Sequence, residues 1–326
     1  MVAPGLPLDI PALHGDLQRV ETALLQSVIT DDPFLTEVAQ SLIVAGGKRL
    51  RPVLSLTSSY VKGNASDAVV DGAIAVELIH LGSLYHDDVM DEASTRRGVA
   101  TANARYGNFV AIVAGDFCMA VSAQIAARLG TEVSALLGAT IGRLCEGQVG
   151  ELQFLFSPDR TEHNYFRTID GKTASLMSAA CRVGALTGEM PHEEIDALTV
   201  YGQRIGMVFQ IADDVLDVCA TDEQLGKPAG NDLLEGVYTL PVLRALHDSL
   251  VEDELRSALD ARVTRANLDQ VRKLIRTSSG VESAIAEGRR FATEAADAIA
   301  SLSNPMVAEQ LAQVGHRLLD RLPLNG

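Results

Sequence analysis

Residues 74–91 read IAVELIHLGSLYHDDVMD and indicate the architecture more clearly than any other part of the chain. Apolar side chains recur at three- and four-residue spacing through Ile74, Leu78, Leu81 and Leu84. This is the period of one face of an α-helix, and nearly every other segment shows it, whereas the alternation typical of strands is almost absent. The sequence therefore predicts an all-α protein in which long helices surround one another.

Short segments with glycine, proline or asparagine divide the chain into predicted helices of roughly 15 to 28 residues. They are Lys62–Asn64, Arg96–Gly98, Leu129–Thr131, Ser157–Asp159, Gly188–Pro191 and Leu225–Pro228. No linker, low-complexity run or composition break divides the 326 residues, so we expect one domain over residues 1–326.

Composition excludes several classes of protein. With 27 Lys and Arg against 43 Asp and Glu, the net charge of −16 argues against nucleic acid as a partner. We find no uninterrupted apolar run long enough to span a membrane and no layout of a signal peptide, so we expect a cytoplasmic protein. The four cysteines form no CxxC pair and are predicted to be free thiols.

Two copies of one acidic motif stand in apolar surroundings, DDVMD at residues 87–91 and DDVLD at residues 213–217. Residues three or four apart share a helix face, so the carboxylates of each copy converge. Burying them unpaired would cost several kcal/mol per charge. A single copy is equally typical of a solvated helix face, but two copies favour a bound divalent cation. Oxygen ligands alone indicate Mg²⁺, which commonly also binds substrate phosphate.

Basic clusters accompany these motifs. GGKRLRP at residues 46–52 contains Lys48, Arg49 and Arg51, and Arg96 and Arg97 follow the first acidic motif. An arginine fork matches phosphate oxygens, although such clusters also occur as solvated loops or as partners of nearby acids. GKT at residues 171–173 lacks the frame of a P-loop.

In this order, the motifs resemble those of the trans-isoprenyl diphosphate synthases, most closely the medium- and long-chain polyprenyl diphosphate synthases. The resemblance rests on GGKRLRP, His80 before DDVMD, the Arg96–Arg97 pair, GKT at 171–173, Gln210 before DDVLD and GKP at 226–228, and spans about residues 40 to 245. It implies a single bundle of long antiparallel helices around a deep central cavity. The two aspartate motifs would face each other across the mouth of that cavity, and the protein would be a homodimer.

The resemblance also implies the reaction, a head-to-tail condensation of isopentenyl diphosphate with an allylic diphosphate such as farnesyl or geranylgeranyl diphosphate. About three Mg²⁺ ions per site would assist ionisation. Asp87, Asp91 and Asp213 would bind these ions, supported by Asp88, Asp214 and Asp217. The residues implied for the diphosphates are Arg96, Lys172 and Lys227 on the allylic side and Lys48, Arg49, Arg51, His80 and Arg97 on the isopentenyl side. Lys172, Thr173 and Gln210 would act where positive charge develops.

The chain departs from the family pattern at Val237, where many relatives have lysine. We expect weaker neutralisation of the diphosphate there rather than inactivity. The resemblance also implies that the product chain passes the residues just before the first motif. Gly82 and Ser83 are small, which predicts an open channel and a product longer than fifteen carbons.

Alternatives remain open at this point. The product could be the twenty-carbon geranylgeranyl diphosphate, or the chain could be a non-catalytic subunit of a heteromeric synthase. A terpene cyclase normally has only one DDxxD motif, and a calcium-binding helical protein would need neither basic cluster. Peripheral membrane contact for product release is also compatible with the sequence.

Overall fold

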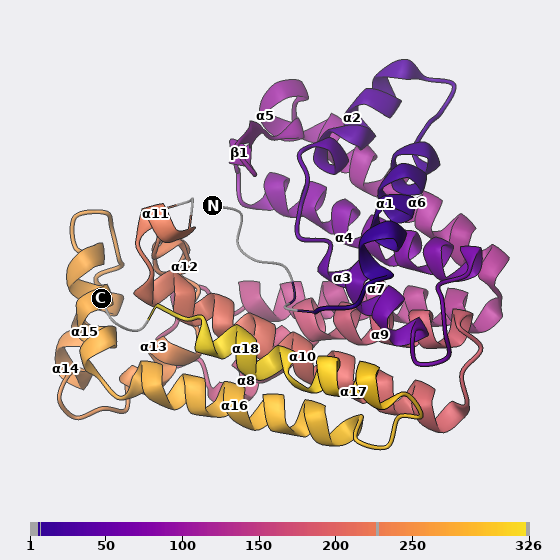
Figure 1. Cartoon of the computed structure of the whole chain (residues 1–326). Helices are drawn as coiled ribbons and strands as arrows, with labels where there is room; N and C mark the ends of the chain where they lie inside the picture. The colour runs from indigo at the N-terminus through magenta and orange to yellow at the C-terminus, as the bar shows by residue number, and fades with distance from the viewer. Residues whose placement is uncertain (1–5, 7, 226–227, 324–326) are drawn as a thin grey trace.

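The computed structural model describes residue 6, residues 8–225 and residues 228–323 (Figure 1). Helices account for 74% of the structure and form a single bundle, which confirms the predicted all-α class. The predicted breaks fall between helices, except that part of 225–228 lies outside the described residues.

In the part of the N-terminal half that the structure describes, the bundle contains seven α-helices. They are α1 (Leu13–Ser27), α2 (Pro33–Val44), α3 (Leu50–Ser59), α4 (Asp67–Met90), α5 (Ala102–Tyr106), α6 (Asn108–Leu129) and α7 (Thr131–Leu152). Polar side chains cap three of them, and Thr101 is the cap of α5. Asp32 accepts the first free N–H groups of α2, and Ser66 does the same for α4.

The C-terminal half begins with α8 (Glu162–Ile169), which continues through a π-helical turn, η1 (Asp170–Ala174), into α9 (Ser175–Thr187). The remaining helices are α10 (His192–Cys219), α11 (Asp222–Leu225), α12 (Asn231–Glu235), α13 (Leu240–Ala245), α14 (Glu252–Asp260), α15 (Leu268–Thr277), α16 (Gly280–Ala298), α17 (Pro305–Ala312) and α18 (Val314–Asp320). Several of these helices are shorter than the predicted 15 to 28 residues.

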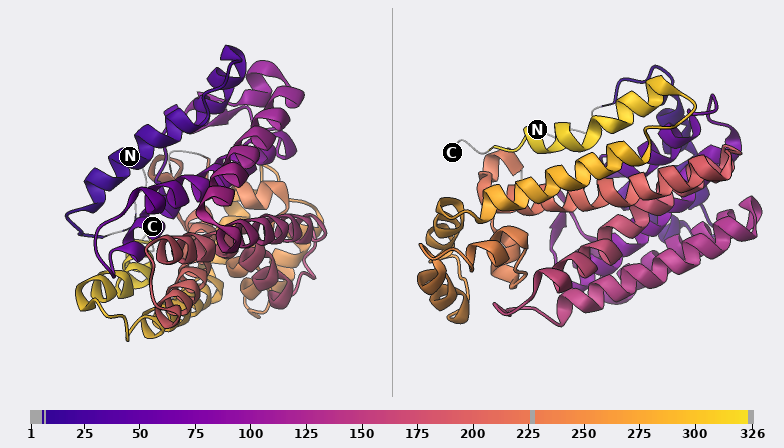
Figure 2. Two further views of the ribbon diagram at one scale, coloured as in Figure 1. Left: turned by 90° about the vertical axis from the view of Figure 1, so that its right-hand side faces the viewer. Right: turned by 90° about the horizontal axis from the view of Figure 1, so that it is seen from below.

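Helix α4 lies in the centre of one apolar cluster and packs closely against α6. Both helices are long and apolar enough to cross a membrane by length and composition, but 72% of the α4 window and 44% of the α6 window are buried inside the bundle. Helix α10 contributes Ile205 to the cluster around α4 and Met207 to a second cluster around α13 to α16. It therefore joins the two halves, and it lies alongside α16 in the views of Figure 2.

A small hairpin interrupts the helices, which the sequence did not predict. Strand β1 (Thr95–Arg96) pairs antiparallel with β2 (Val99–Ala100), with Arg97 and Gly98 between them. Both turn residues have positive φ, 54° and 80°, as the tight turns favoured in two-residue hairpins require. Strands this short are below the length at which alternation can be recognised. The hairpin directs the two adjacent arginines to different partners.

Candidate active site

A cavity of about 1260 Å³ opens among the loop before α3, helices α4, α6, α7 and α10, the hairpin and η1. It brings together twelve of the predicted site residues, taken from distant parts of the sequence. They are Lys48, Arg49, Arg51, His80, Ser83, Asp87, Arg96, Arg97, Lys172, Thr173, Gln210 and Asp213. Asp88, Asp91, Asp214, Asp217 and Gly82 are not among the lining residues, and Lys227 lies outside the described residues.

The first aspartate motif ends α4 and presents its carboxylates unequally. Asp87 lines the cavity, where burial raises the pKa of its carboxyl group. Asp88 is buried beneath it and accepts a hydrogen bond from Nε of Arg96 at 2.5 Å. The other carboxylate oxygen of Asp88 has no hydrogen-bond partner among the described residues. Asp91 is exposed at the end of α4.

The second motif lies on α10, and its carboxylates also have different surroundings. Asp213 lines the cavity. Asp214 is buried and accepts hydrogen bonds from Tyr165 at 2.5 Å and from Gln210 at 2.8 Å, and burial raises its pKa to about 7. Asp217 is also buried, and it accepts the backbone N–H groups that begin α12. Helical spacing alone does not decide whether residue 213 or 214 faces the site; the resemblance implies residue 213, and residue 213 lines the cavity.

The basic side of the cavity is built from the loop at residues 46–49. Gly46 and Gly47 have positive φ, and a Cβ atom on Gly47 would lie 2.9 Å from the guanidinium of Arg97. Arg97 donates to the backbone carbonyls of Leu42 and Gly46 beneath this loop. Glycine suits both positions because their positive φ angles are strained for other residues.

Arg51 and His80 lie deeper on the same side. Burial lowers the pKa of Arg51 to about 10, so this group remains protonated at neutral pH. Burial and the neighbouring arginines hold the pKa of His80 well below its ordinary value, so the imidazole is neutral. Cationic donors therefore surround a neutral histidine at this end of the cavity.

Arg49 lines the cavity, but its guanidinium is engaged by protein groups. It donates to Glu21, to Glu77 at 3.1 Å and to the carbonyl of Ile43 at 2.9 Å, and the residue is only 6% exposed. Sequence reasoning missed Glu77, although it lies one helical turn before His80 on α4. This ion-pair network fixes the loop that carries Lys48 and leads to Arg51 in the first turn of α3.

The π-helical turn η1 presents Lys172 and Thr173 opposite the first motif. A Cβ atom on Gly147 of α7 would lie 2.4 Å from the backbone nitrogen of Lys172, so glycine permits this helix contact. Lys172 donates to Glu151 at 2.5 Å. Burial opposes its charge, but Glu151, Asp87 and Asp91 outweigh that effect and raise its pKa.

The position of Gly82 corrects the expectation for the product channel. A Cβ atom there would lie 2.9 Å from the carbonyl oxygen of Gly115 and 3.0 Å from Cγ of Met119. Gly82 thus lies in the contact between α4 and α6, whereas Ser83 and Met119 line the cavity. The two positions differ by about 100° around the helix, and the sequence did not indicate which side α6 covers.

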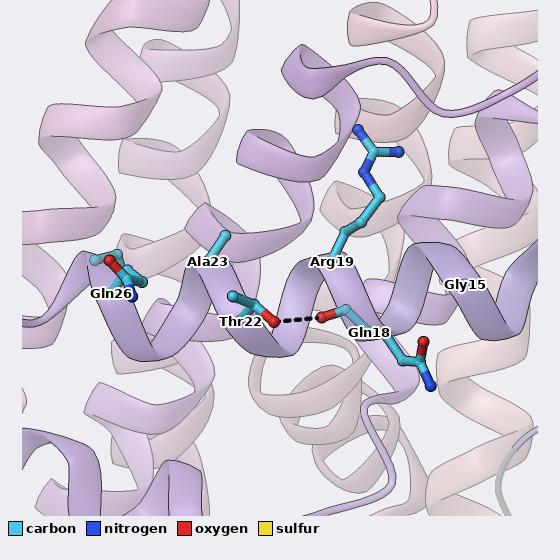
Figure 3. Close-up of a pocket in the computed structure, with 7 residues that line it drawn as sticks. Gly15, Gln18, Arg19, Thr22, Ala23 and Gln26 are labelled. Carbon is cyan, nitrogen blue, oxygen red and sulfur yellow. Dashed lines mark hydrogen bonds between the residues drawn. The ribbon is translucent and has the colours of Figure 1, made fainter.

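A second hollow, of about 690 Å³, lies on the outer face of α1 (Figure 3). Arg19 is the charged residue among those that line it, and its guanidinium is paired with Asp16 and Asp67. Thr22 bonds back to the carbonyl of Gln18 on the same helix. Its charged group is paired within the protein, and we assign the hollow no ligand.

The donor set of the main cavity fits a magnesium ion that is shared with a substrate. Within the part of the chain that the structure describes, no three acidic, histidine or cysteine side chains form a metal-binding group by themselves. Asp87 and Asp213 nevertheless line one cavity together with several cations. This suits Mg²⁺, which usually takes one or two carboxylates and completes its shell with water and phosphate oxygens.

The chain belongs to the polyprenyl synthetase family, whose model matches residues 32–278. Similar proteins include heptaprenyl diphosphate synthase component 2 of Bacillus subtilis, 33% identical over 93% of this chain and 87% of that protein. The octaprenyl diphosphate synthase of Escherichia coli is 35% identical over 94% of this chain and 96% of its own. The protein is a trans-polyprenyl diphosphate synthase, a prenyltransferase.

Solved structures of the family agree with the fold. The polyprenyl synthase of Caulobacter crescentus, complexed with calcium and isoprenyl diphosphate, superposes with a TM-score of 0.87 at 30% identity and covers 98% of this chain and 100% of its own. The relatives differ in the product that their names give, heptaprenyl or octaprenyl. Family membership therefore defines the reaction but leaves the product length open.

Proposed function

We propose that this protein condenses isopentenyl diphosphate head-to-tail with an allylic diphosphate, such as farnesyl or geranylgeranyl diphosphate. The product would be a medium- or long-chain all-trans polyprenyl diphosphate. One observation carries this proposal: a single cavity contains a carboxylate from each aspartate motif, Asp87 and Asp213, together with the basic groups of the 46–52 loop, the hairpin and η1.

The basic loop side of the cavity would bind isopentenyl diphosphate. Lys48, Arg51 and Arg97 supply positive charge there, and the neutral imidazole of His80 adds a hydrogen-bonding group without further repulsion. Arg49 supports this site chiefly through its ion pairs with Glu21 and Glu77, which hold the loop in place.

The acidic side would bind the allylic diphosphate together with magnesium. Asp87, Asp91 and Asp213 would hold the ions directly, with Asp88, Asp214 and Asp217 in support. Magnesium neutralises the diphosphate when bound and makes it a competent leaving group. Arg96 and Lys172 donate to the diphosphate oxygens, and Lys227 is proposed for the same role.

Ionisation of the allylic substrate leaves a carbocation that the wall of the cavity must stabilise and protect from water. Thr173 and Gln210 line this region with oxygen atoms, and Lys172 lies beside them. Fixed dipoles aimed at developing charge lower the barrier, because they need no reorganisation during the reaction. The isopentenyl double bond then attacks the cation, and loss of a proton to the released diphosphate completes one cycle.

The product chain would extend past Ser83 and Met119, and the small side chain at residue 83 supports a product longer than fifteen carbons. A twenty-carbon product, geranylgeranyl diphosphate, is the alternative. Val237 takes the place of the family lysine, and we propose that Lys172 and Lys227 compensate for it.

We further propose that the protein acts as a homodimer in the cytoplasm. Exposed apolar side chains on α6 support a subunit interface, since Phe109 is 88% and Val113 54% exposed. A heteromeric arrangement is the alternative, because the name of the Bacillus subtilis relative describes one component of a synthase. The same apolar surface suits transient membrane contact during product release.

The test is incubation of the purified chain with Mg²⁺, labelled isopentenyl diphosphate and a fifteen- or twenty-carbon allylic primer. Products longer than twenty carbons, absent for Asp87→Ala, would support the proposal. Products that stop at twenty carbons would favour the alternative chain length. If no primer is extended by the chain alone, the protein requires a partner subunit, and conversion of Val237 to lysine becomes the next variant.

A further inference from the structure

Three side-chain hydrogen bonds connect the cavity wall to a buried tyrosine. The hydroxyl of Thr173 donates to Oε1 of Gln210 at 2.7 Å, and Nε2 of Gln210 donates to Oδ1 of Asp214 at 2.8 Å. The hydroxyl of Tyr165 donates to Oδ2 of Asp214 at 2.5 Å. Thr173 and Gln210 line the cavity, whereas Asp214 and Tyr165 are each only 1% exposed and lie behind it.

The chemistry of these groups determines which atom donates and which accepts in each of the three hydrogen bonds. A carboxylate only accepts, so the amide N–H of Gln210 must face Asp214 and its carbonyl oxygen must face Thr173. Thr173 then has to donate its hydrogen to Gln210, away from the cavity, and the lone pairs of its oxygen remain free on the cavity side. A proton on Oδ2 of Asp214 would leave Oδ1 as the same acceptor.

We propose that Tyr165 and Asp214 are positioning residues. They orient the Gln210 amide, which in turn holds the Thr173 hydroxyl with its oxygen lone pairs toward the allylic cation. This inference rests on the proposed function. An oxygen whose lone pairs already point at the developing positive charge stabilises the transition state more than a freely rotating hydroxyl does. Asp214 thereby acts through Gln210 and Thr173 rather than as a ligand of magnesium.

The backbone segments that carry Thr173 and Gln210 are held in place independently of these side-chain hydrogen bonds. A Cβ atom on Gly206 of α10 would lie 2.4 Å from Cα of Ala174, so η1 and α10 are in close contact beside Thr173 and Gln210. This contact sets where the two side chains stand. The hydrogen bond to Asp214 then decides which way the Gln210 amide faces, because either rotation fits the same volume.

Tyr165 is itself held in a fixed orientation. Its ring packs edge-on against Phe166 at 5.2 Å between centroids, and the guanidinium of Arg160 lies 5.6 Å from its centroid. Arg160 is buried and donates to the carbonyl of Tyr238 at 3.1 Å. A cation near the ring stabilises negative charge on the phenol oxygen. The hydroxyl group is therefore a stronger hydrogen-bond donor to Asp214.

The two oxygens of Asp214 contrast with those of Asp88 in the first motif. Both oxygens of Asp214 accept from fixed neutral donors inside the protein, whereas one oxygen of Asp88 lacks a partner among the described residues. A metal ligand would have to exchange these hydrogen bonds for the ion. The existing contacts therefore favour a positioning role for Asp214.

The test compares Asp214→Asn and Tyr165→Phe with Tyr201→Phe in the full-length protein. Asparagine at 214 can accept from Tyr165 and donate to Gln210, which reverses the amide and turns an N–H group toward Thr173. Tyr165→Phe removes one fixing bond. Tyr201 is a matched control, because it is fully buried and donates to the carbonyl of Leu311 at 2.9 Å, outside the cavity.

Three quantities should be measured for each variant: kcat and KM, the Mg²⁺ concentration that gives half-maximal activity, and binding of a cation analogue. The analogue is an ammonium compound in which nitrogen replaces the cationic carbon, added with inorganic diphosphate and followed by calorimetry. We expect Asp214→Asn to lower kcat about 100-fold and Tyr165→Phe about tenfold. KM and the Mg²⁺ midpoint should change less than about threefold. Binding of the analogue should weaken while binding of a neutral substrate analogue is retained.

A shift of the Mg²⁺ midpoint by more than about tenfold in Asp214→Asn, with kcat restored at high Mg²⁺, would make Asp214 a metal ligand and overturn the proposal. Equal losses of kcat in Tyr165→Phe and Tyr201→Phe would reduce Tyr165 to a structural role. If Asp214→Asn does not fold, Tyr165→Phe decides. An unmodified chain that forms no product refutes the proposed activity of the chain alone and indicates a partner subunit, whereas an active chain with unaffected variants refutes only this inference.

Discussion

Substitution of Ser83 by phenylalanine should shorten the product. Ser83 lines the cavity, and among the described residues its hydroxyl bonds only to the carbonyl of His80 in the same helix, at 2.9 Å. The larger ring would therefore enter the cavity without breaking a contact between helices. Gly82, by contrast, already touches the backbone of α6.

Helix geometry gives the depth of cavity that Ser83→Phe would leave below Asp87. Ser83 lies four residues before Asp87, which is about 6 Å along the axis at 1.5 Å per residue. An extended chain advances about 1.2 Å per bond, so an isoprene unit with four chain bonds needs about 5 Å. A ring at residue 83 leaves depth for between one and two units below Asp87. With the unit being added, products should stop at about ten to fifteen carbons.

The assay is the incubation described above, run with a five-carbon allylic primer as well, because the expected short products cannot arise from fifteen- or twenty-carbon primers; product lengths are resolved by chromatography. Ser83→Ala is the matched control and should leave the distribution unchanged. Gly82→Ala should instead lower the thermal midpoint, because the added methyl group would lie 2.9 Å from the carbonyl of Gly115. A Ser83→Phe enzyme that still makes the full-length product would show that the channel does not follow α4.

Three further predictions follow from the site. Arg49→Met should lower the free energy of unfolding by about 3–5 kcal/mol in denaturant titrations, because it leaves Glu77 buried without its partner; a loss below about 1 kcal/mol would contradict the network. Asp87→Asn should reduce kcat at least about 100-fold, and chelation of divalent cations should abolish activity in the unmodified protein; activity that survives chelation would remove the metal from the mechanism. Gly147→Ala should lower kcat while changing the free energy of unfolding little, because a Cβ atom 2.4 Å from the backbone of Lys172 displaces that residue. Enzyme kinetics and denaturant titration measure the two effects, and an unchanged kcat would show that η1 adapts.

Helical periodicity and the order of the charged motifs predicted the bundle and most of the charged residues that line its cavity. They did not decide which carboxylate of a pair faces the cavity. Asp213 and Asp214 are adjacent on α10 and differ by about 100° in direction. The side that is buried is set by Tyr165, which donates to Asp214 from α8. That donor belongs to another helix, so no local pattern could reveal it.

Contacts from distant helices also explain why the sequence did not predict the surroundings of Gly82 and Arg49. Both were assigned from their place in a motif, yet their surroundings come from distant segments. The backbone of Gly115 in α6 packs directly against Gly82 and leaves no room for a side chain there. Arg49 is held by ion pairs with Glu21 of α1 and Glu77 of α4. A motif gives the residue type and its neighbours in sequence, whereas packing decides whether a charge faces a ligand or another side chain.

Pairing within the protein also explains how a chain with net charge −16 can bind a polyphosphate. Arg49 is neutralised by Glu21 and Glu77, but Nε of the neighbouring Arg51 has no hydrogen-bond partner among the described residues. Burial lowers the pKa of Arg51 and raises that of Asp87, so the charged form of each is disfavoured on its own side of the cavity. A diphosphate bound with Mg²⁺ would stabilise both charged forms at once, the guanidinium through the anion and the carboxylate through the metal. The local arrangement of these groups, rather than the net charge, therefore determines the affinity for the substrate.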